Sequence, residues 1–341
     1  MRIAVDVGFG YTKAVNEAGK MVSFPSIVAP RAGGGIDIMG GDQDDYLVSL
    51  YSQGVRFGSY YIGDAGLINN GTRAWDENFA QNRNLKTLVA TALALVGDRT
   101  PVSLAVGLPM AYYRNQKEEV KDGLAALDMD VLIEKHQIRR TVMVKDIVVY
   151  PQGAGVYYGA VLTPAGEIKD IELMQQSVGV IDIGHRTTDV MAMSRGRKGL
   201  TPREDMIGGF DYGMNAAIKQ IKAMVDKVSQ ANIPIYWVEQ ALTWNQGILE
   251  YKGKRYNLKK FETQVYAQVA ELIVASVKQK WGQELDRLSV ILIAGGGGSA
   301  LYPFLKVELE MAKLVQDPGF ANAQGFLAAQ GLSFKQAAAG N

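Results

Sequence analysis

The chain has 341 residues, and a length of this order favours two domains over one. Hydrophobic residues make up 48% and charged residues 21%, as in a folded globular protein, and the formal net charge of +1 excludes a strongly basic nucleic-acid-binding protein. The absence of cysteine excludes disulfides, cysteine-based zinc sites and a cysteine nucleophile, and no apolar run approaches the roughly 20 residues of a membrane span.

The first half of the chain alternates between strand and helix patterns. We expect strands at residues 2–7, 12–15, 21–28, 102–107 and 142–149, and helices at 84–96, 114–126 and 152–162. Residues 31–84 are rich in glycine, aspartate, asparagine and tyrosine, with breakers at 33–35 and 40–41, and they predict a small irregular lobe. The first residues lack the features of a signal peptide, so we expect a cytoplasmic protein.

The second half begins with a repeat of the opening pattern. A strand at 178–183, a glycine turn and a strand at 188–193 are followed by a hairpin at 195–199. Helices are expected at 211–229, 261–281, 302–315 and 321–330, and an apolar strand at 288–294 ends in four glycines. Residues 337–341 form a small, polar tail that we expect to fray. Strands alternating with helices predict an α/β protein.

One motif occurs in both halves of the chain. An Asp-x-Gly-x-x-x-Thr pattern starts at Asp6 and again at Asp182, each time at the end of an apolar strand and before another strand. A repeat of this kind indicates two copies of one supersecondary unit. We therefore expect domain I to comprise residues 1–151 and 320–341, with the irregular lobe at about 31–84, and domain II to comprise residues 152–319.

The residue types in this motif are suited to binding a polyphosphate. Gly8 and Gly184 allow backbone amides to approach a phosphate, and successive turn amides form an anion-binding nest. Threonine hydroxyls add donors, and Lys13 adds a positive charge. Asp6 and Asp182 would face the same phosphates, which requires a divalent cation between them, and Mg²⁺ prefers such oxygen ligands. The alternative is that each motif is an ordinary strand followed by a tight hairpin turn.

Other nucleotide-binding motifs fit the sequence less well. The segment 295–300 satisfies a relaxed dinucleotide fingerprint, but the short remainder of the chain lacks the second strand and acidic ribose ligand of a Rossmann unit. A P-loop pattern does not occur in the sequence.

The paired motifs resemble the phosphate 1 and phosphate 2 hairpins of the actin, Hsp70 and sugar-kinase superfamily. Segments 150–155 and 317–325 are similar to its two connecting helices, 208–211 to its glycine turn, and 293–299 to its adenosine motif. The resemblance implies a two-domain actin-like (ribonuclease H-like) α/β fold with a central nucleotide cleft, holding ATP, with GTP as the open alternative, and Mg²⁺. The residues expected to contact the nucleotide are Gly8, Phe9, Gly10, Tyr11, Thr12, Lys13, Gly184, His185, Arg186, Thr187, Gly208, Gly209, Gly295, Gly296, Gly297 and Gly298.

The same resemblance assigns catalytic and metal-binding roles. Gln152 occupies the position that orients the attacking water, since a glutamine amide can hold a water in line although it cannot act as a base. The alternative is a polar residue at a helix N-terminus. Asp182 is expected to polarise that water or hold a Mg²⁺-bound one, and Asp6 to contact the metal through water. We expect His185 to contribute its backbone and not its ring.

Within this superfamily the length, the insertion and the Pro-Gln-Gly and Phe-Ala-Asn-Ala-Gln-Gly strings resemble the ParM/StbA plasmid-segregation actins. This implies ATP-dependent filaments that hydrolysis destabilises and whose assembly speeds hydrolysis, linked to plasmid DNA by a separate DNA-binding adaptor, with no direct contact to nucleic acid or membrane. Gln152 departs from the glutamate of some ParM proteins. A cytoskeletal or scaffold actin unrelated to plasmids, and a monomeric phosphotransferase of this fold, remain as alternatives.

Overall fold

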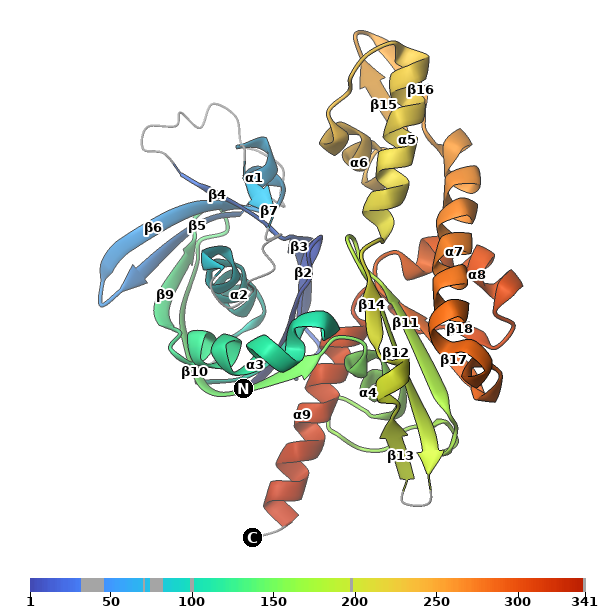
Figure 1. Ribbon diagram of the computed structural model, residues 1–341. Coiled ribbons are helices and arrows are strands. Elements are labelled where there is room, and N and C mark those ends of the chain that lie inside the picture. The colour runs from blue at the N-terminus through green and yellow to red at the C-terminus, as the bar shows by residue number, and fades with distance from the viewer. Residues whose placement is uncertain (32–45, 70, 74–81, 99–100, 197–198, 340–341) are drawn as a thin grey trace. The chain divides into compact units, whose positions relative to one another are not determined.

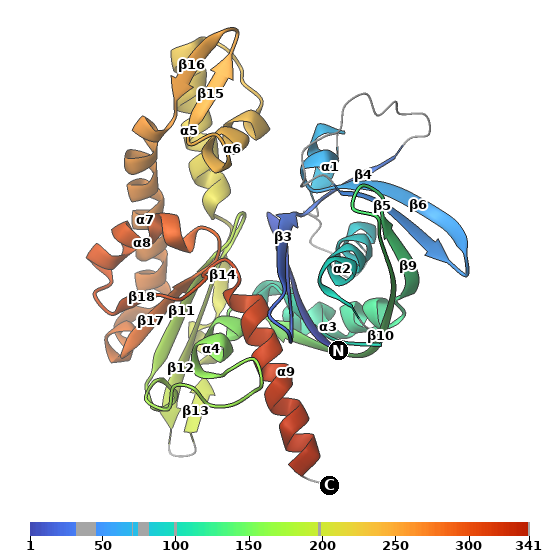
Figure 2. The same ribbon diagram turned by 180° about the vertical axis from the view of Figure 1, so that it is seen from behind.

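The computed structural model describes residues 1–31, 46–69, 71–73, 82–98, 101–196 and 199–339. The chain divides into two compact units, which we describe separately: unit 1 is Met1–Gln175 with Phe320–Asn341, and unit 2 is Gln176–Gly319. Residues 152–175, expected in the second domain, group with unit 1. The reason is that helix α4 (Ala154–Val161) packs along α9 (Ala321–Ala339), which also belongs to unit 1 (Figure 2).

Unit 1 is built on a ten-stranded mixed sheet (Figure 1). Across the sheet its strands are β3 (Met21–Pro25), β2 (Tyr11–Asn16), β1 (Arg2–Val7), β8 (Val102–Leu108), β10 (Ile138–Pro151), β9 (Asp128–Ile133), β5 (Tyr46–Ser52), β6 (Val55–Ile62), β4 (Ile27–Pro30) and β7 (Thr72–Arg73). The central strands β1, β8 and β10 run parallel, and β2 and β9 flank them antiparallel. The helices besides α4 and α9 are α1 (Asp64–Ile68), α2 (Arg83–Val96), α3 (Met110–Ala125) and the short 3₁₀ helix η1 (Leu173–Gln175).

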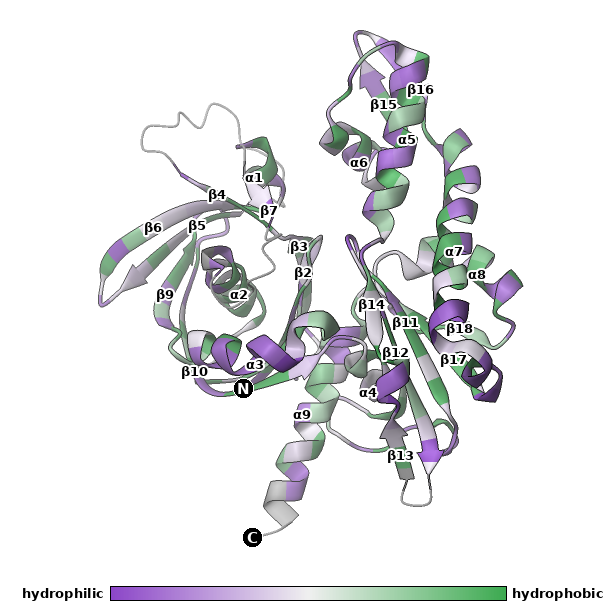
Figure 3. Cartoon of the chain, viewed as in Figure 1, coloured by the Kyte–Doolittle hydropathy of each residue, from purple (hydrophilic) through white to green (hydrophobic). Residues whose placement is uncertain are grey.

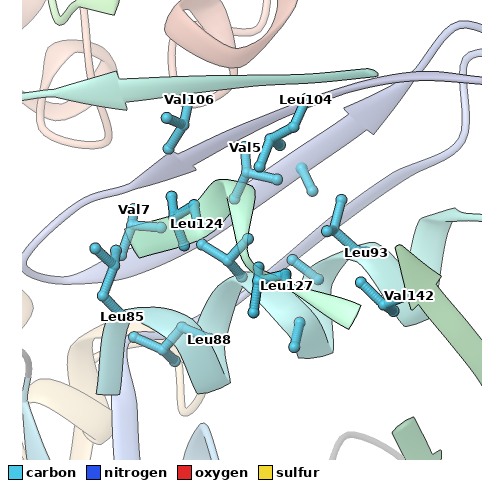
Figure 4. Close-up of a cluster of buried hydrophobic side chains, with 14 of the residues drawn as sticks. Val5, Val7, Leu85, Leu88, Leu93, Leu104, Val106, Leu124, Leu127 and Val142 are labelled. Atoms are coloured by element: carbon cyan, nitrogen blue, oxygen red, sulfur yellow. The ribbon is translucent and has the colours of Figure 1, made fainter. Parts of the chain in front are cut away.

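Strand β1 is buried on both faces, as a central parallel strand covered by helices should be. Val5 and Val7 point into the core cluster that includes α2 (Figure 4). On the other face Ala4 packs with Phe326 of α9. Because side chains alternate along a strand, Asp6 follows Ala4 on the α9 side of the sheet. Asp6 therefore lies near the carboxyl end of β1, on the face that α9 covers.

Unit 2 contains a six-stranded sheet, with β13 (Gly199–Pro202), β12 (Thr188–Gly196), β11 (Val178–Ile183), β17 (Val290–Ala294) and β18 (Ala312–Leu314) in order and β14 (Gly208–Phe210) paired to β12. Its central strands are strongly hydrophobic (Figure 3). Its helices are α5 (Met214–Ser229), α6 (Ile235–Thr243), α7 (Lys259–Trp281) and α8 (Gly298–Glu308), with 3₁₀ helices η2 (Glu204–Met206) and η3 (Gly282–Arg287). A separate hairpin joins β15 (Ile248–Tyr251) to β16 (Lys254–Asn257).

Several elements differ from the sequence expectation. The lobe expected to be irregular contains β5 and β6, which join the large sheet through β9, so long-range pairing gives this segment its order. The breakers at 33–35 and 40–41 lie outside the described residues. The helix expected at 302–315 ends at Glu308, because residues 312–314 pair with β17. Helix α9 continues to Ala339, through the part of the expected tail that is described. In the described ranges no helix combines the length and apolarity needed to cross a bilayer.

Candidate functional site

The two copies of the motif form the same turn, one in each unit. In unit 1 the Gly8 N–H donates to the Tyr11 carbonyl at 3.0 Å, and in unit 2 the Gly184 N–H donates to the Thr187 carbonyl at 2.9 Å. The flanking strands have matching registers, since the residue after each aspartate pairs with the motif threonine. The internal repeat is thus a structural repeat, with its turn at the same distance from the aspartate each time.

Asp6 and Gln152 form a buried polar pair in unit 1. Both are buried, with 5% and 7% of their surface exposed, and the Gln152 side-chain amide donates to Asp6 Oδ1 at 2.6 Å. Burial raises the pKa of Asp6, while the positive charge of Lys13 and the bond from Gln152 oppose this rise. Lys13 lies directly opposite Asp6 across β1 and β2. The carboxylate is therefore held between a cation and an amide.

Backbone geometry places Gln152 at the end of β10. Its N–H donates to the Leu108 carbonyl at 2.9 Å, which ties it to the end of the neighbouring strand β8. The next residue, Gly153, has φ of 86°, a conformation that favours glycine, and precedes the first residue of α4. The Gly153 N–H donates to Asn322 Oδ1 at 2.9 Å. Sequence reasoning assigned no role to Asn322, although it lies in the string that resembles the second connecting helix.

Side chains in and next to the unit 1 turn pack or form hydrogen bonds within the protein. Phe9 belongs to the hydrophobic core, and the Thr12 and Ser26 hydroxyls share a buried hydrogen bond of 2.9 Å. The Gly10 carbonyl accepts from the Ser26 N–H and from Arg73. The Thr188 hydroxyl of unit 2 donates to the Tyr212 carbonyl. The hydroxyls of both motif threonines therefore form hydrogen bonds within the protein. The backbone of the turns, rather than these hydroxyls, is what could hold a phosphate.

In unit 2 a second carboxylate lies beside Asp182. Asp189 is directly opposite Asp182 in the β11–β12 pair, and both are buried. Opposed residues of an antiparallel pair share one face, so these carboxylates are neighbours, and like charges in such positions repel. The Thr187 hydroxyl donates to Asp189 at 3.4 Å. Sequence reasoning assigned no role to Asp189, although its place one residue beyond the motif threonine puts it opposite Asp182 if the motif forms a hairpin.

The predicted segments of unit 2 meet at the carboxyl ends of β11 and β17. The first amides of α5, at Met214 and Asn215, donate to the Gly184 and His185 carbonyls at 3.1 and 2.7 Å. The Gly297 N–H donates to the Ile183 carbonyl at 2.9 Å. In open parallel sheets this edge is where ligands bind. Hydrogen bonds thus connect the start of α5 to the turn at 184–187, and the glycine run at 295–298 to the end of β11.

Glycine is required where these segments touch. Gly295 has φ of 84°, and a Cβ there would lie 2.2 Å from the Ile183 carbonyl oxygen and 2.5 Å from Asp182 Oδ1. A Cβ on Gly209 would lie 3.0 Å from Asp189 Oδ1, and one on Gly213 would lie 2.5 Å from the Gly184 oxygen. Sequence reasoning omitted Gly213. A Cβ on exposed Gly296, in contrast, would have no neighbour within 4 Å. The run thus combines packed glycines with one that borders open space.

The side chains of His185 and Arg186 in the unit 2 turn point toward protein partners. His185 Nδ1 lies 3.8 Å from Glu239 Oε1 of α6, and the side chains are only 9% and 15% exposed. Arg186 Nε donates to Asp211 Oδ1 at 3.0 Å. Gly208 lies against the side chain of Lys280. The His185 ring thus faces Glu239, and a contribution of its backbone to ligand binding stays a prediction.

The donor set suits an oxygen-ligated cation bound together with a ligand. Within the described ranges no group of three or more histidine, aspartate or glutamate side chains could hold a metal ion. Asp6 in unit 1 and Asp182 with Asp189 in unit 2 instead offer one and two carboxylates. Mg²⁺ commonly takes one or two carboxylates and completes its shell with phosphate oxygens and water. The single carboxylate of unit 1 and the pair of unit 2, each taken alone, fit that pattern.

Comparisons with known proteins agree for both halves of the chain. Residues 4–155 match the family described as actin like proteins N terminal domain, and residues 180–307 match archaeal actin homologue MreB-like, C-terminal. Archaeal actin homologues of Thermoplasma acidophilum and Thermoplasma volcanium are each 23% identical, over 95% of this chain and 97% of theirs.

Solved structures share the fold. A subunit of a 15-stranded ParM filament from Clostridium botulinum has a TM-score of 0.81 at 24% identity, covering 98% of this chain and 99% of that one. An archaeal actin homologue in complex with ADP has a TM-score of 0.77 at 20% identity, covering 96% and 98%. The fold is therefore the two-domain α/β fold of these proteins. With both halves matched by actin-like families, the chain belongs to the actin-like proteins.

Proposed function

We propose that this protein is an ATPase that assembles into filaments in an ATP-dependent manner. The observation that carries the proposal is the repeated turn, with one register and one aspartate in each unit, in a chain whose halves both match actin-like families. The archaeal actin homologue of similar fold was solved in complex with ADP, and the ParM protein of similar fold was solved as a filament. Both structures support nucleotide binding and self-assembly here. ATP is the proposed nucleotide, and GTP is the alternative.

The geometry of Gln152 supports a role in positioning water. A carboxylate only accepts hydrogen bonds, so ionised Asp6 turns the NH₂ end of the Gln152 amide toward itself at 2.6 Å. The amide oxygen is thereby left to accept a hydrogen bond from a water molecule. Positioning is the main demand of phosphoryl transfer, which a glutamine meets without acting as a base. Asp182 and Asp6 would hold Mg²⁺, which neutralises charge on the phosphates when bound.

Light scattering and sedimentation with ATP and Mg²⁺ test the proposal. We expect a signal that rises above a critical protein concentration with ATP and is absent with EDTA. Asp182→Ala should abolish turnover while circular dichroism shows a retained fold, and Gln152→Ala should slow hydrolysis roughly 10²-fold with ATP still bound. No concentration-dependent rise with either ATP or GTP would refute filament formation and favour a monomeric phosphotransferase. Near-normal turnover in Asp182→Ala would refute the site.

For the biological role we propose plasmid segregation through a DNA-binding adaptor, supported by the similarity to ParM structures. The near-zero net charge is consistent with indirect contact to DNA, since direct binding relies on basic residues. A cytoskeletal actin without a plasmid is the second candidate, favoured by the archaeal relatives. Loss of a marked plasmid on deletion of the gene supports the first role. Unchanged plasmid retention with altered cell shape supports the second.

A further inference from the structure

We propose that Asn322 is a positioning residue for hydrolysis, holding Gln152 in its productive place through the Gly153 amide. This inference rests on the proposed function, because Gln152 must orient water for its position to matter. Asn322 is the second residue of α9, and Gln152 precedes α4, so the residues are far apart in sequence. One hydrogen bond links them, from the N–H of Gly153, the residue that follows Gln152, to Asn322 Oδ1.

This bond fixes the backbone beside Gln152. Asn322 Oδ1 accepts from the Gly153 N–H at 2.9 Å, and this contact is buried. Gly153 adopts a positive φ of 86°, so the direction in which the chain leaves Gln152 depends on this residue's conformation. The Asn322 side chain acts as the acceptor for an amide at the start of α4, where helix amides lack intrahelical partners.

A separate hydrogen bond fixes the side chain of Gln152. Its amide donates to Asp6 Oδ1 at 2.6 Å, while its own N–H is held by Leu108. Hydrogen bonds thus fix the Gln152 N–H, the N–H of the following residue Gly153 and the Gln152 side-chain amide. Removing the Asn322 acceptor would leave a buried N–H without its partner and would release one of these constraints.

Close packing keeps Asn322 in register with α4. A Cβ on Gly155 would lie 2.7 Å from the Asn322 carbonyl oxygen and 2.8 Å from its Cα, so the two backbones touch at this level. A Cβ on Gly325 would lie 1.6 Å from the Gly155 oxygen. Because glycine allows the helices to pack so closely, we expect a shift of Asn322 to displace Gly153 as well. Unit 1 resumes at Phe320, so Asn322 is also among the first residues of this unit after the boundary.

A double-mutant cycle on the full chain tests the inference. We expect Asn322→Ala to lower kcat roughly 10- to 100-fold, with KM changed less than about two-fold, because misplacement of a positioning group affects the transition state. In the Gln152→Ala background, Asn322→Ala should change kcat by less than about two-fold, since both changes remove one function. Asn322→Asp keeps the acceptor and should restore most of kcat.

Asn16→Ala provides the matched control. Asn16 is also buried in unit 1, donates to Val96 and accepts from two backbone amides, yet does not lie on this path. It should lower the unfolding temperature without a kcat effect that depends on Gln152. Losses from Asn322→Ala and Gln152→Ala that multiply, or wild-type kcat in Asn322→Ala, would overturn the inference.

A readout without turnover separates this inference from the proposed function. The Gln152 side-chain amide, identified by NMR as the signal lost in Gln152→Ala, should exchange slowly with water in the wild type and at least roughly ten-fold faster in Asn322→Ala. Unchanged exchange would sink the inference even if the protein hydrolyses ATP. A protein that hydrolyses neither ATP nor GTP, but shows the faster exchange, would contradict the proposed ATPase while supporting the structural link.

Discussion

At the scale of single residues, the candidate site holds charges that stability alone would not favour. Asp6 is buried, and burial raises its pKa despite the opposing effects of Lys13 and Gln152. Asp182 and Asp189 are buried side by side. Such arrangements are common at functional sites, where groups are placed for a ligand and destabilise the empty protein.

Asp6→Asn should therefore stabilise the nucleotide-free protein in EDTA at pH 7.5. A raised folded-state pKa means that the folded protein disfavours the charged form. The resulting loss of stability is absent below the unfolded pKa of about 3.9 and complete above the folded pKa. We expect a higher unfolding temperature for Asp6→Asn, by about 2–4 °C for each kcal/mol, with the gain vanishing toward pH 4. ATPase activity should fall, because an asparagine no longer dictates the orientation of the Gln152 amide.

Asp130→Asn is the control with opposite sign. The hydrogen bonds from Thr141 and Arg139 lower the pKa of Asp130, so its charge stabilises the folded protein above the unfolded pKa, and that stability is lost as the pH falls. Its substitution should lower the unfolding temperature slightly at pH 7.5. A destabilised Asp6→Asn protein at this pH would contradict the pKa argument.

Substitutions at the adjacent glycines Gly295 and Gly296 should affect different properties, stability in the first case and ligand binding in the second. Gly295→Ala should destabilise the protein by about 1–3 kcal/mol or more, because it combines positive φ with a Cβ 2.2 Å from the Ile183 oxygen. Gly296→Ala should leave the unfolding temperature unchanged, because its Cβ has no protein neighbour within 4 Å. It should nevertheless weaken binding of a fluorescent ATP analogue, since that space is where the adenosine motif would seat its ligand. Equal analogue affinity in Gly296→Ala and the wild type would exclude this placement.

At the scale of elements, the crossing of α4 and α9 depends on glycine. Alanine usually stabilises a helix interior by about 1 kcal/mol relative to glycine. At Gly325 the sign should reverse, because the new Cβ would lie 1.6 Å from the Gly155 oxygen and force the helices apart. We expect chemical denaturation to show Gly325→Ala destabilised by about 1–3 kcal/mol or more.

Gly319→Ala is the corresponding control. Gly319 lies just before α9, and a Cβ there would meet nothing within 4 Å. It should change stability by less than about 0.5 kcal/mol, as expected away from close contacts. If Gly325→Ala proved as stable as Gly319→Ala, the helices would not be in the close contact described.

At the scale of the whole molecule, assembly and nucleotide binding should be linked. If ATP favours the conformation that assembles, filaments must bind ATP more tightly than subunits by the factor through which ATP lowers the critical concentration. We expect this equality for a slowly hydrolysed ATP analogue, with critical concentrations from sedimentation and affinities from fluorescence below and above assembly. An analogue that promotes assembly but binds both forms equally would contradict the coupling.

The linear sequence was informative about local structure and the motif. The Asp-x-Gly-x-x-x-Thr repeat predicted a turn whose register recurs in both units, because strand alternation and turn chemistry depend on neighbouring residues. The strands at the centre of each sheet were predictable, since their continuous apolar runs reflect burial on both faces. The family resemblance also followed from these short segments and was confirmed by matches across both halves.

Tertiary structure decided what depends on residues distant in sequence. The order of β5, β6 and β9 comes from pairing across the sheet, and residues 152–175 belong to unit 1 because α4 packs on α9. The same holds for the site, where the sequence determined Asp6 and Gln152 as candidates, but only folding placed them 2.6 Å apart and brought Asn322 to Gly153. Such contacts leave no local pattern, because hydrogen bonds between remote segments arise only when the chain packs.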